Sequence, residues 1–161
     1  MSQVRRIAVV GTGLLGGSIG LGLKASGYTG SIVGVGRRQE TLDRAKARGC
    51  ITEGSTSLAE AVSDCDLIVL AMPLGAFEAS LKELATADLS GAVLTDVGST
   101  KRVVCDLVRE LLPYDAARLF VGSHPMAGSE RHGPDNAEAS LFAKRPCILT
   151  PEADTDGDAV T

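Results

Sequence analysis

Residues Ile7-Ala8-Val9-Val10-Gly11-Thr12-Gly13-Leu14-Leu15-Gly16 form the stretch that decides the fold. Four apolar residues predict a short buried strand, and the pattern G-x-G-x-x-G follows at once and leads into helix-forming residues. In that setting Gly11 permits a tight turn, Gly13 lets the backbone approach a pyrophosphate, and Gly16 allows the helix to pack closely on the strand. The free N–H groups and positive dipole end of the helix favour phosphate. The sequence therefore predicts dinucleotide binding by Gly11, Thr12, Gly13, Leu14, Leu15 and Gly16, the alternative being a glycine-rich turn without a ligand.

Short apolar runs alternate with helical patterns along the rest of the chain. The strand-like runs, which suit burial on both faces of a parallel sheet, are Ile7–Val10, Ile32–Val35, Leu67–Ala71, Ala92–Thr95, Leu119–Val121 and Cys147–Leu149. The helical patterns between them are Leu14–Ser26, Gln39–Arg48, Leu58–Ser63, Gly75–Ala87 and Thr100–Leu112, and Gly27 stops the first. This alternation predicts an α/β, doubly wound, Rossmann-type fold, with a mostly parallel sheet and helices on both faces.

Composition and charge narrow the classes of function. A chain of 161 residues suits one domain, and 44% hydrophobic and 22% charged residues are ordinary values for a soluble globular protein. The net charge of −4 argues against nucleic acid or an anionic membrane as the main partner. No apolar stretch is long enough to span a membrane, and the N-terminus lacks the apolar region of a secretory signal.

The four cysteines indicate a reducing environment. Cys50, Cys65, Cys105 and Cys147 form no C-x-x-C pair, and with only two histidines the spacing of zinc ligands is absent. We expect reduced, mostly buried thiols, no metal site and a cytoplasmic location.

The end of the second predicted strand indicates which dinucleotide is bound. NAD-binding versions of the motif place Asp or Glu there, about 20 residues after the glycines, to hold the ribose 2′-hydroxyl. This chain has Gly36 at that position, followed by Arg37 and Arg38. A missing carboxylate and two guanidinium groups suit a 2′-phosphate. We therefore expect NADP to be preferred, with NAD as the weaker alternative, unless the two arginines are only solvated surface residues.

Two further segments should open at the same edge of the sheet as the glycine loop, because the carboxyl ends of parallel strands share one crevice. Asp96-Val97-Gly98-Ser99-Thr100-Lys101 follows one strand, and Ser99 or Thr100 can cap the next helix. Gly122-Ser-His-Pro-Met-Ala-Gly-Ser-Glu130 follows the next strand and places His124 in a stiff loop at its end. Such a histidine can act as an acid or base near neutral pH, or it can simply bond to the backbone.

Together these segments resemble the prephenate/arogenate (cyclohexadienyl) dehydrogenase family of tyrosine biosynthesis. The matching pieces are Val10–Ser18, Asp96–Lys101 and Ser123–Glu130. The first piece is shared with many Rossmann dehydrogenases, whereas the other two, in this order and spacing, are specific. The resemblance covers essentially the whole chain and implies the N-terminal nucleotide-binding domain of such an enzyme.

The resemblance implies an NADP-dependent oxidative decarboxylation of prephenate or arogenate. His124 is the implied base near the ring hydroxyl, and Ser99 would hydrogen-bond that hydroxyl or orient His124 and the nicotinamide. Ser129 and Glu130 are implied on the substrate side. Asp96 and Ser99 complete the expected cofactor-binding set, which also holds Gly36, Arg37 and Arg38. Lys101 is interpreted as an exposed helix lysine, although it could neutralise a phosphate or carboxylate, and His132 is interpreted as a surface residue.

The family normally continues into a helical domain that dimerises and supplies groups for the substrate's carboxylates. We expect a dinucleotide-binding domain at 1–151, and at 152–161 an acidic linker at the start of that missing domain, where Asp156 or Asp158 could cap a helix near Ala159. From the resemblance we expect the full-length form to be a homodimer and this chain to be a truncated piece of it. Two alternatives remain open. One is a nucleotide-binding regulatory module without catalysis, and the other is a Rossmann dehydrogenase of the β-hydroxyacid or pyrroline-carboxylate reductase type.

Overall fold

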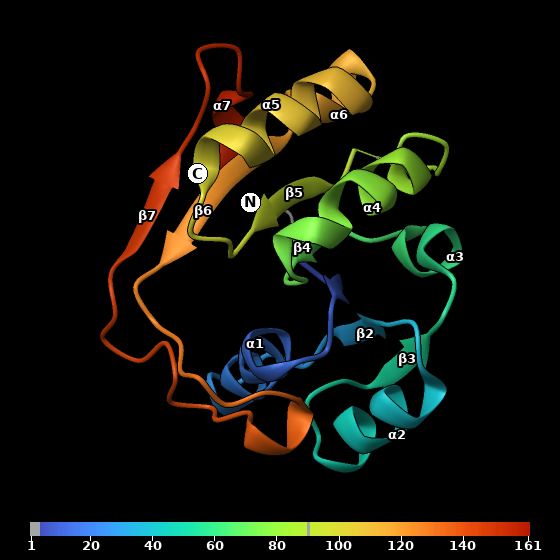
Figure 1. Ribbon diagram of the computed structural model, residues 1–161, viewed down its shortest axis with the longest axis vertical. Coiled ribbons are helices and arrows are strands. Elements are labelled where there is room, and N and C mark those ends of the chain that lie inside the picture. Colours follow the sequence, from blue (N-terminus) through green and yellow to red (C-terminus); the bar gives the residue numbers. More distant parts are fainter. Residues whose placement is uncertain (1–3, 90) are drawn as a thin grey trace.

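The computed structural model describes residues 4–89 and 91–161, so the first three residues of the expected domain and Ser90 lie outside the described residues. Within the described chain, seven strands form one sheet in the order β3-β2-β1-β4-β5-β6-β7 (Figure 1). Neighbouring strands are parallel except for β7, which is antiparallel to β6. The strands are β1 Arg6–Val10, β2 Ser31–Val35, β3 Glu53–Ser55, β4 Leu67–Leu70, β5 Val93–Asp96, β6 Phe120–Pro125 and β7 Cys147–Thr150.

Helices connect the strands and cover both faces of the sheet (Figure 1). They are α1 Leu14–Ala25, α2 Gln39–Ala47, α3 Leu58–Val62, α4 Phe77–Leu84, α5 Lys101–Leu111, α6 Tyr114–Ala117 and α7 Gly157–Val160, with 3₁₀ turns η1 Leu74–Ala76 and η2 Pro134–Asn136. The predicted doubly wound, mostly parallel Rossmann-type fold is therefore confirmed.

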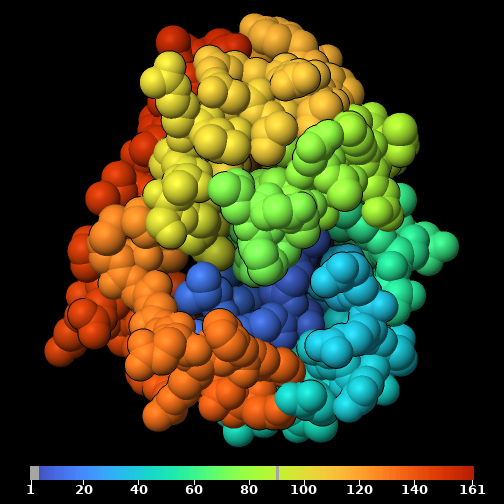
Figure 2. Space-filling view, viewed as in Figure 1, coloured from blue at the N-terminus to red at the C-terminus, as the bar shows by residue number. Residues whose placement is uncertain are grey.

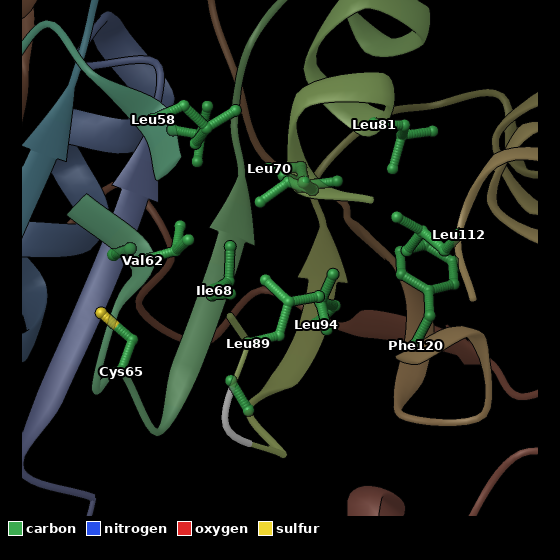
Figure 3. Close-up of a cluster of buried hydrophobic side chains, with 14 of the residues drawn as sticks. Leu58, Val62, Cys65, Ile68, Leu70, Leu81, Leu89, Leu94, Leu112 and Phe120 are labelled. Atoms are coloured by element: carbon green, nitrogen blue, oxygen red, sulfur yellow. The ribbon is translucent and has the colours of Figure 1, made fainter. Parts of the chain in front are cut away.

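Residues Ile7–Val10 of strand β1 are all apolar because both faces of the strand are buried there. Ala8 and Val10 belong to the core cluster beneath α3, α4 and α5, whereas Ile7 and Val9 belong to the cluster on the α1 and α2 face. Because successive side chains of a strand point to opposite faces, a central strand needs a continuous apolar run. Figure 3 shows part of the first cluster, where Leu81 of α4 lies above the side chains of β4 and β5.

The glycines in the turn between β1 and α1 have the backbone conformation and close contacts that the sequence predicts. Gly11 has φ +99°, and a Cβ added there would lie 2.8 Å from the carbonyl oxygen of Ala71. A Cβ at Gly16 would overlap the Gly11 carbonyl oxygen and lie 2.9 Å from Val9 Cγ1. Gly27, with φ +87°, directly follows the C-cap Ser26 and ends the helix as expected.

The structure differs from the predicted secondary structure in four elements. Strand β3 was not predicted, because its three residues include a glycine and two polar side chains. The expected helix Gly75–Ala87 is a 3₁₀ turn followed by a shorter helix, and α6 was not predicted. Strand β7 was expected to be buried on both faces, but it lies at the sheet edge with Ile148 and Leu149 about half exposed.

The histidine that the sequence places in a loop lies instead inside a strand. Pairing with β7 extends β6 through Pro125, and His124 stands opposite Ile148 in the antiparallel register. Apolar periodicity ends at Val121, so residues 122–125 have no local pattern that predicts a strand. The strand gives His124 a more rigid backbone than a loop would.

The C-terminal segment is attached to the domain by polar contacts. Asp156 accepts a hydrogen bond from the N–H of Asp158 at 3.0 Å and so caps α7, which begins at Gly157 rather than near Ala159. Arg118 pairs with Asp156 at 3.1 Å, and Arg109 pairs with Glu152 at 3.3 Å. The acidic side chains therefore bind arginines of the domain as well as facing solvent.

Three of the four thiols are buried, as the sequence predicts, and Cys147 is exposed on β7. Burial, aided by a hydrogen bond with Glu152, raises the pKa of the Cys105 thiol to about 11. Among the residues that the structure describes, no helix is both long and apolar enough to cross a membrane.

Candidate active site

A cavity of about 500 Å³ lies at the carboxyl ends of the parallel strands. Four segments line it: 13–15 of the glycine loop and α1, 71–77 after β4, 97–104 after β5, and 129–133 after β6. Figure 2 shows this hollow, in which the blue start of the chain is visible between green, yellow and orange segments. The fold thus brings Gly13, Ser99 and Ser129 together, as the sequence predicts for loops at one sheet edge.

A second cavity, of about 360 Å³, lies on the other side of the glycine loop. Gly11, Thr12 and Gly13 line it together with the segment Gly36-Arg37-Arg38 that follows β2. Gly13 and the pair Met72-Pro73 line both cavities. An elongated ligand could therefore pass over Gly13 with one end in each cavity.

The start of α1 is suited to an anionic group. Gly13 is its N-cap and contributes no side-chain cap, and the first turn of the helix holds no acidic residue. A Cβ placed on Gly13 would meet nothing within 4 Å, so the space beside its backbone is open. Unsatisfied N–H groups and the helix dipole favour phosphate at such a position. The residues present therefore fit a dinucleotide with its pyrophosphate over Gly13.

Arg37 and Arg38 are exposed at the rim of the second cavity, and neither guanidinium forms an ion pair within the described chain. Gly36 directly follows strand β2 and lines that cavity. A Cβ there would lie 3.3 Å from Leu42 Cδ2 and 3.6 Å from Thr12 Oγ1, so a side chain at residue 36 needs only a small adjustment. The end of β2 therefore offers two unpaired positive charges and no carboxylate of its own. Glu83, which also lines this cavity, accepts hydrogen bonds from the N–H groups of Leu58 and Ala59.

His124 lines a third cavity, of about 400 Å³, and is half-buried there. The residues around this cavity are His124, Pro125, Met126, Ala127, Gly128, Leu141 and Arg145. Ser99 is not among them, so the two expected catalytic side chains line different cavities, with Ser99 on the loop after β5 and His124 near the end of β6.

Arg145 is a site residue that the sequence analysis missed. It precedes β7, whose antiparallel pairing sets Cys147 opposite Pro125 and so brings Arg145 to the cavity of His124. Its guanidinium forms no ion pair with any described residue. Only knowledge of the β6–β7 pairing could have revealed it, because nothing in the local sequence around Arg145 distinguishes it from other surface arginines.

The segment after Gly128 is divided between cavity and solvent. Ser129 lines the first cavity, and its hydroxyl accepts a hydrogen bond from the N–H of Arg131 at 3.2 Å. Glu130 is exposed and lines none of the three cavities. Arg131 and His132 contribute to the wall of the first cavity, so His132, although exposed as expected, also borders the glycine loop.

The Asp96–Lys101 loop is tied down from inside the protein. Asp96 is fully buried, and its Oδ2 accepts hydrogen bonds from Gly98 N–H at 2.8 Å and from the Lys101 ammonium. The expectation that Lys101 is an exposed helix lysine is wrong, because its side chain is only 16% exposed. Thr100 is the N-cap of α5, but its hydroxyl makes no capping bond. Asp96, expected in the cofactor-binding set, directs its carboxylate toward the protein.

Within residues 4–89 and 91–161, no group of three or more His, Cys, Asp and Glu side chains is arranged to hold a metal ion. The three cavities are lined by imidazole, hydroxyl and guanidinium groups and by the backbone of the glycine loop.

Comparison with known proteins places this arrangement in a family. Residues 19–161 match the family described as prephenate dehydrogenase, nucleotide-binding domain. A prephenate dehydrogenase of Lactococcus lactis is 36% identical over 93% of this chain and 42% of its own length. The crystal structure of prephenate dehydrogenase from A. aeolicus in complex with hydroxyphenyl propionate and NAD+ superimposes with a TM-score of 0.87 at 31% identity, over 98% of this chain and 54% of that one.

A third similar protein is the arogenate dehydrogenase of Synechocystis, whose structure gives a TM-score of 0.81 at 32% identity, over 96% of this chain and 53% of that one. The chain spans about half the length of the relatives that it matches.

Proposed function

The chain belongs to the prephenate dehydrogenase family as its nucleotide-binding domain, and from this premise we propose that it binds the nicotinamide dinucleotide of a dehydrogenase that acts on prephenate or arogenate. The observation that carries the proposal is the glycine loop that lies between two cavities, with Gly13 lining both. Membership of the family also argues against the β-hydroxyacid and pyrroline-carboxylate reductase alternatives, which lack the Ser123–Glu130 segment.

The preferred dinucleotide in this proposal is NADP. Arg37 and Arg38 are two unpaired cations beside the cavity on the β2 side, and Gly36 offers no carboxylate to a ribose 2′-hydroxyl. A 2′-phosphate would bind the guanidinium groups by charge-assisted hydrogen bonds. The A. aeolicus relative was crystallised with NAD+, so cofactor preference in this chain depends on its own residues.

His124 and Ser99 carry the proposed chemistry of the protein. Bound nicotinamide would supply the hydride acceptor for oxidation of the ring carbon that bears the hydroxyl. Neutral His124 would accept the proton of that hydroxyl as the carbon becomes carbonyl-like and the ring carboxylate leaves as carbon dioxide. Ser99, in the cavity beside Gly13, would hydrogen-bond the hydroxyl or orient the nicotinamide.

The substrate side is proposed to include Arg145, Ser129 and Glu130. Arg145 is the cation in the cavity of His124, and the substrates of this family are anionic, so its guanidinium is suited to a substrate carboxylate. Ser129 lies at the wall of the first cavity, which Gly13 and Ser99 also line. Glu130 lines none of these cavities, so its role would require substrate or a further domain to reach it.

The experiment that tests the proposal is a calorimetric titration of this chain with NADP and with NAD, followed by an assay with prephenate and with arogenate. Saturable NADP binding at least ten times tighter than NAD binding is expected. Binding of neither nucleotide would contradict the proposal. Binding without turnover would fit two interpretations: a nucleotide-binding half that needs a substrate half, or a regulatory module without catalysis. An assay of the full-length form with both substrates would distinguish them. Homodimerisation of a full-length form and a cytoplasmic location stay predictions.

A further inference from the structure

The buried ion pair between Asp96 and Lys101 has no part in the proposed chemistry. Asp96 ends β5 with no exposed surface, and Lys101 begins α5 with a side chain that is 16% exposed. A charge pair in the interior carries a desolvation cost that apolar residues of similar volume would avoid. The pair is therefore poorly explained by stability alone, and its other contacts indicate what it does.

The Asp96 carboxylate connects the loop that follows β5 with the end of strand β6. Its Oδ2 accepts the N–H of Gly98 at 2.8 Å, and its Oδ1 accepts the N–H of Ser123 at 3.1 Å. The Ser123 hydroxyl also donates to the backbone carbonyl of Asp96. Gly98 directly precedes Ser99, and Ser123 directly precedes His124. Each contact thus lies one residue away from a candidate catalytic side chain.

Lys101 completes this connection. Its ammonium contacts Asp96 and donates to the carbonyl oxygen of Ser123 at 2.6 Å. That carbonyl belongs to the peptide bond between Ser123 and His124, and a peptide bond is planar. A donor that fixes the plane of this peptide also fixes the direction in which the backbone enters His124.

We propose that Asp96 and Lys101 are positioning residues, whose ion pair holds the Ser99 loop and the His124 strand in one fixed relation so that the hydroxyl and the imidazole can act on the same substrate. The catalytic consequence rests on the proposed dehydrogenase function. The sheet pairing of β5 with β6 ends at Thr95 and Val121, so the contacts of Asp96 and Lys101 join the two backbones beyond that point, where they lead to Ser99 and His124. A displacement of about 1 Å in such a site can cost about 100-fold in rate.

The first test uses NMR to measure how firmly the Ser99 loop and the His124 strand are held in this chain. Lys101→Met removes the ammonium and keeps an unbranched side chain, and amide hydrogen exchange is followed at Gly98 and Ser123. Exchange at both amides should accelerate at least tenfold, and the ring signals of His124 should move. Lys82→Met is the matched control, because Lys82 forms an exposed pair with Glu78 on α4 at 2.6 Å. Lys82→Met should leave the exchange rates of both amides unchanged. The ring signals of His132, the other histidine, should stay in place in both variants.

A second variant keeps the test decisive if Lys101→Met fails to fold. The double variant Asp96→Asn/Lys101→Met removes both charges and leaves no uncompensated charge in the interior. It should fold and show the same faster exchange at Gly98 and Ser123. Wild-type exchange at these amides in a folded variant would overturn the proposal.

The second test separates positioning from cofactor binding in the complete dehydrogenase that the proposed function implies. The Lys101→Met enzyme should lose at least tenfold in kcat while its dissociation constant for NADP stays within twofold, and Lys101→Arg should recover part of the loss. An equal loss in NADP affinity would overturn the proposal and return Asp96 to the cofactor-binding set. If the wild-type chain binds no nucleotide, the proposed function fails, and the exchange experiment still decides whether the pair holds the Ser99 loop to the His124 strand.

Discussion

Gly20, in the middle of α1, packs directly against the backbone of Cys50, so closely that a Cβ at residue 20 would overlap the Cys50 carbonyl oxygen. Cys50 follows α2, and this approach sets how near α1 lies to the segment that leads into β3. We predict that Gly20→Ala lowers the free energy of unfolding by about 3 kcal/mol or more, because backbone must move to admit the methyl group. Urea denaturation of the chain measures the change.

Gly22 provides the control in the same helix. A Cβ at Gly22 would lie 3.3 Å from the carbonyl oxygen of Ala139, which a slight shift of that loop relieves. Alanine is favoured over glycine in a helix by about 1 kcal/mol, so Gly22→Ala should stay within about 1 kcal/mol of wild type. Equal stability of the Gly20→Ala and Gly22→Ala proteins would contradict the packing argument.

Cofactor preference should reverse at Gly36. Gly36→Asp adds a carboxylate at the end of β2, where space for a side chain is nearly sufficient. The carboxylate would accept a hydrogen bond from a ribose 2′-hydroxyl and repel a 2′-phosphate. We expect NADP affinity to fall at least tenfold and NAD affinity to rise, as measured by calorimetric titration of the variant with each nucleotide.

The matched control for this change is Gly36→Asn, which has nearly the same shape without the charge. It should weaken NADP much less than the aspartate does. A parallel loss of both nucleotides in Gly36→Asp would point to a distorted loop and would remove the residue from the recognition of the ribose.

Much of the fold could be predicted from the sequence because its signals are local. The apolar run before Gly11 and the glycines themselves determine β1, the turn and α1 without help from distant residues. The apolar run Cys147–Leu149 does predict a strand there, and β7 confirms it. The edge position of β7, its antiparallel pairing and the continuation of β6 could not be predicted, because they depend on the pairing of the two strands and not on the apolar periodicity of either.

The candidate site was predictable to a similar degree and for the same reason. Loops at one edge of a parallel sheet must converge, and Gly13 and Ser99 do line one cavity. The cavity shared by His124 and Arg145 depends on the antiparallel pairing of β7, which a local pattern does not show. The burial of Lys101 depends on the fully buried carboxylate of Asp96 that it meets across the loop.

Asp66 should make stability depend on pH in the acid range. Hydrogen bonds from the backbone N–H groups of Arg5 and Arg6, at 2.7 and 2.9 Å, lower the pKa of this carboxyl below its usual value of 3.8. A lowered pKa in the folded state gives stability that is complete above the unfolded-state pKa and is lost as pH falls through the folded-state pKa. Asp66→Ala should therefore cost on the order of 1 kcal/mol at pH 7, and progressively less below pH 4.

Chemical denaturation at pH 7 and at pH 3 measures that difference. Asp154→Ala is a suitable control, because Asp154 is exposed and its side chain accepts no hydrogen bond within the described chain. It should leave stability unchanged at both pH values. A cost for Asp66→Ala that is the same at both pH values would mean that the carboxylate does not hold the start of β1 by charge-assisted hydrogen bonds.

His124 and Arg145 line one cavity but should fail in different ways when changed in the complete dehydrogenase. His124→Asn removes the proposed proton acceptor, so kcat should fall by about 10²–10⁴-fold, while the dissociation constant for NADP stays nearly constant because the glycine loop borders other cavities. Arg145→Ala should chiefly raise KM for the anionic substrate, because it removes binding that ground state and transition state share. Arg102→Ala is the matched control, because it removes an equal charge from the exposed face of α5, away from the cavity. It should leave both kcat and the KM for the substrate unchanged. Steady-state kinetics with prephenate and arogenate at saturating NADP separate these outcomes, and a mild effect of His124→Asn on kcat would exclude the imidazole as the base.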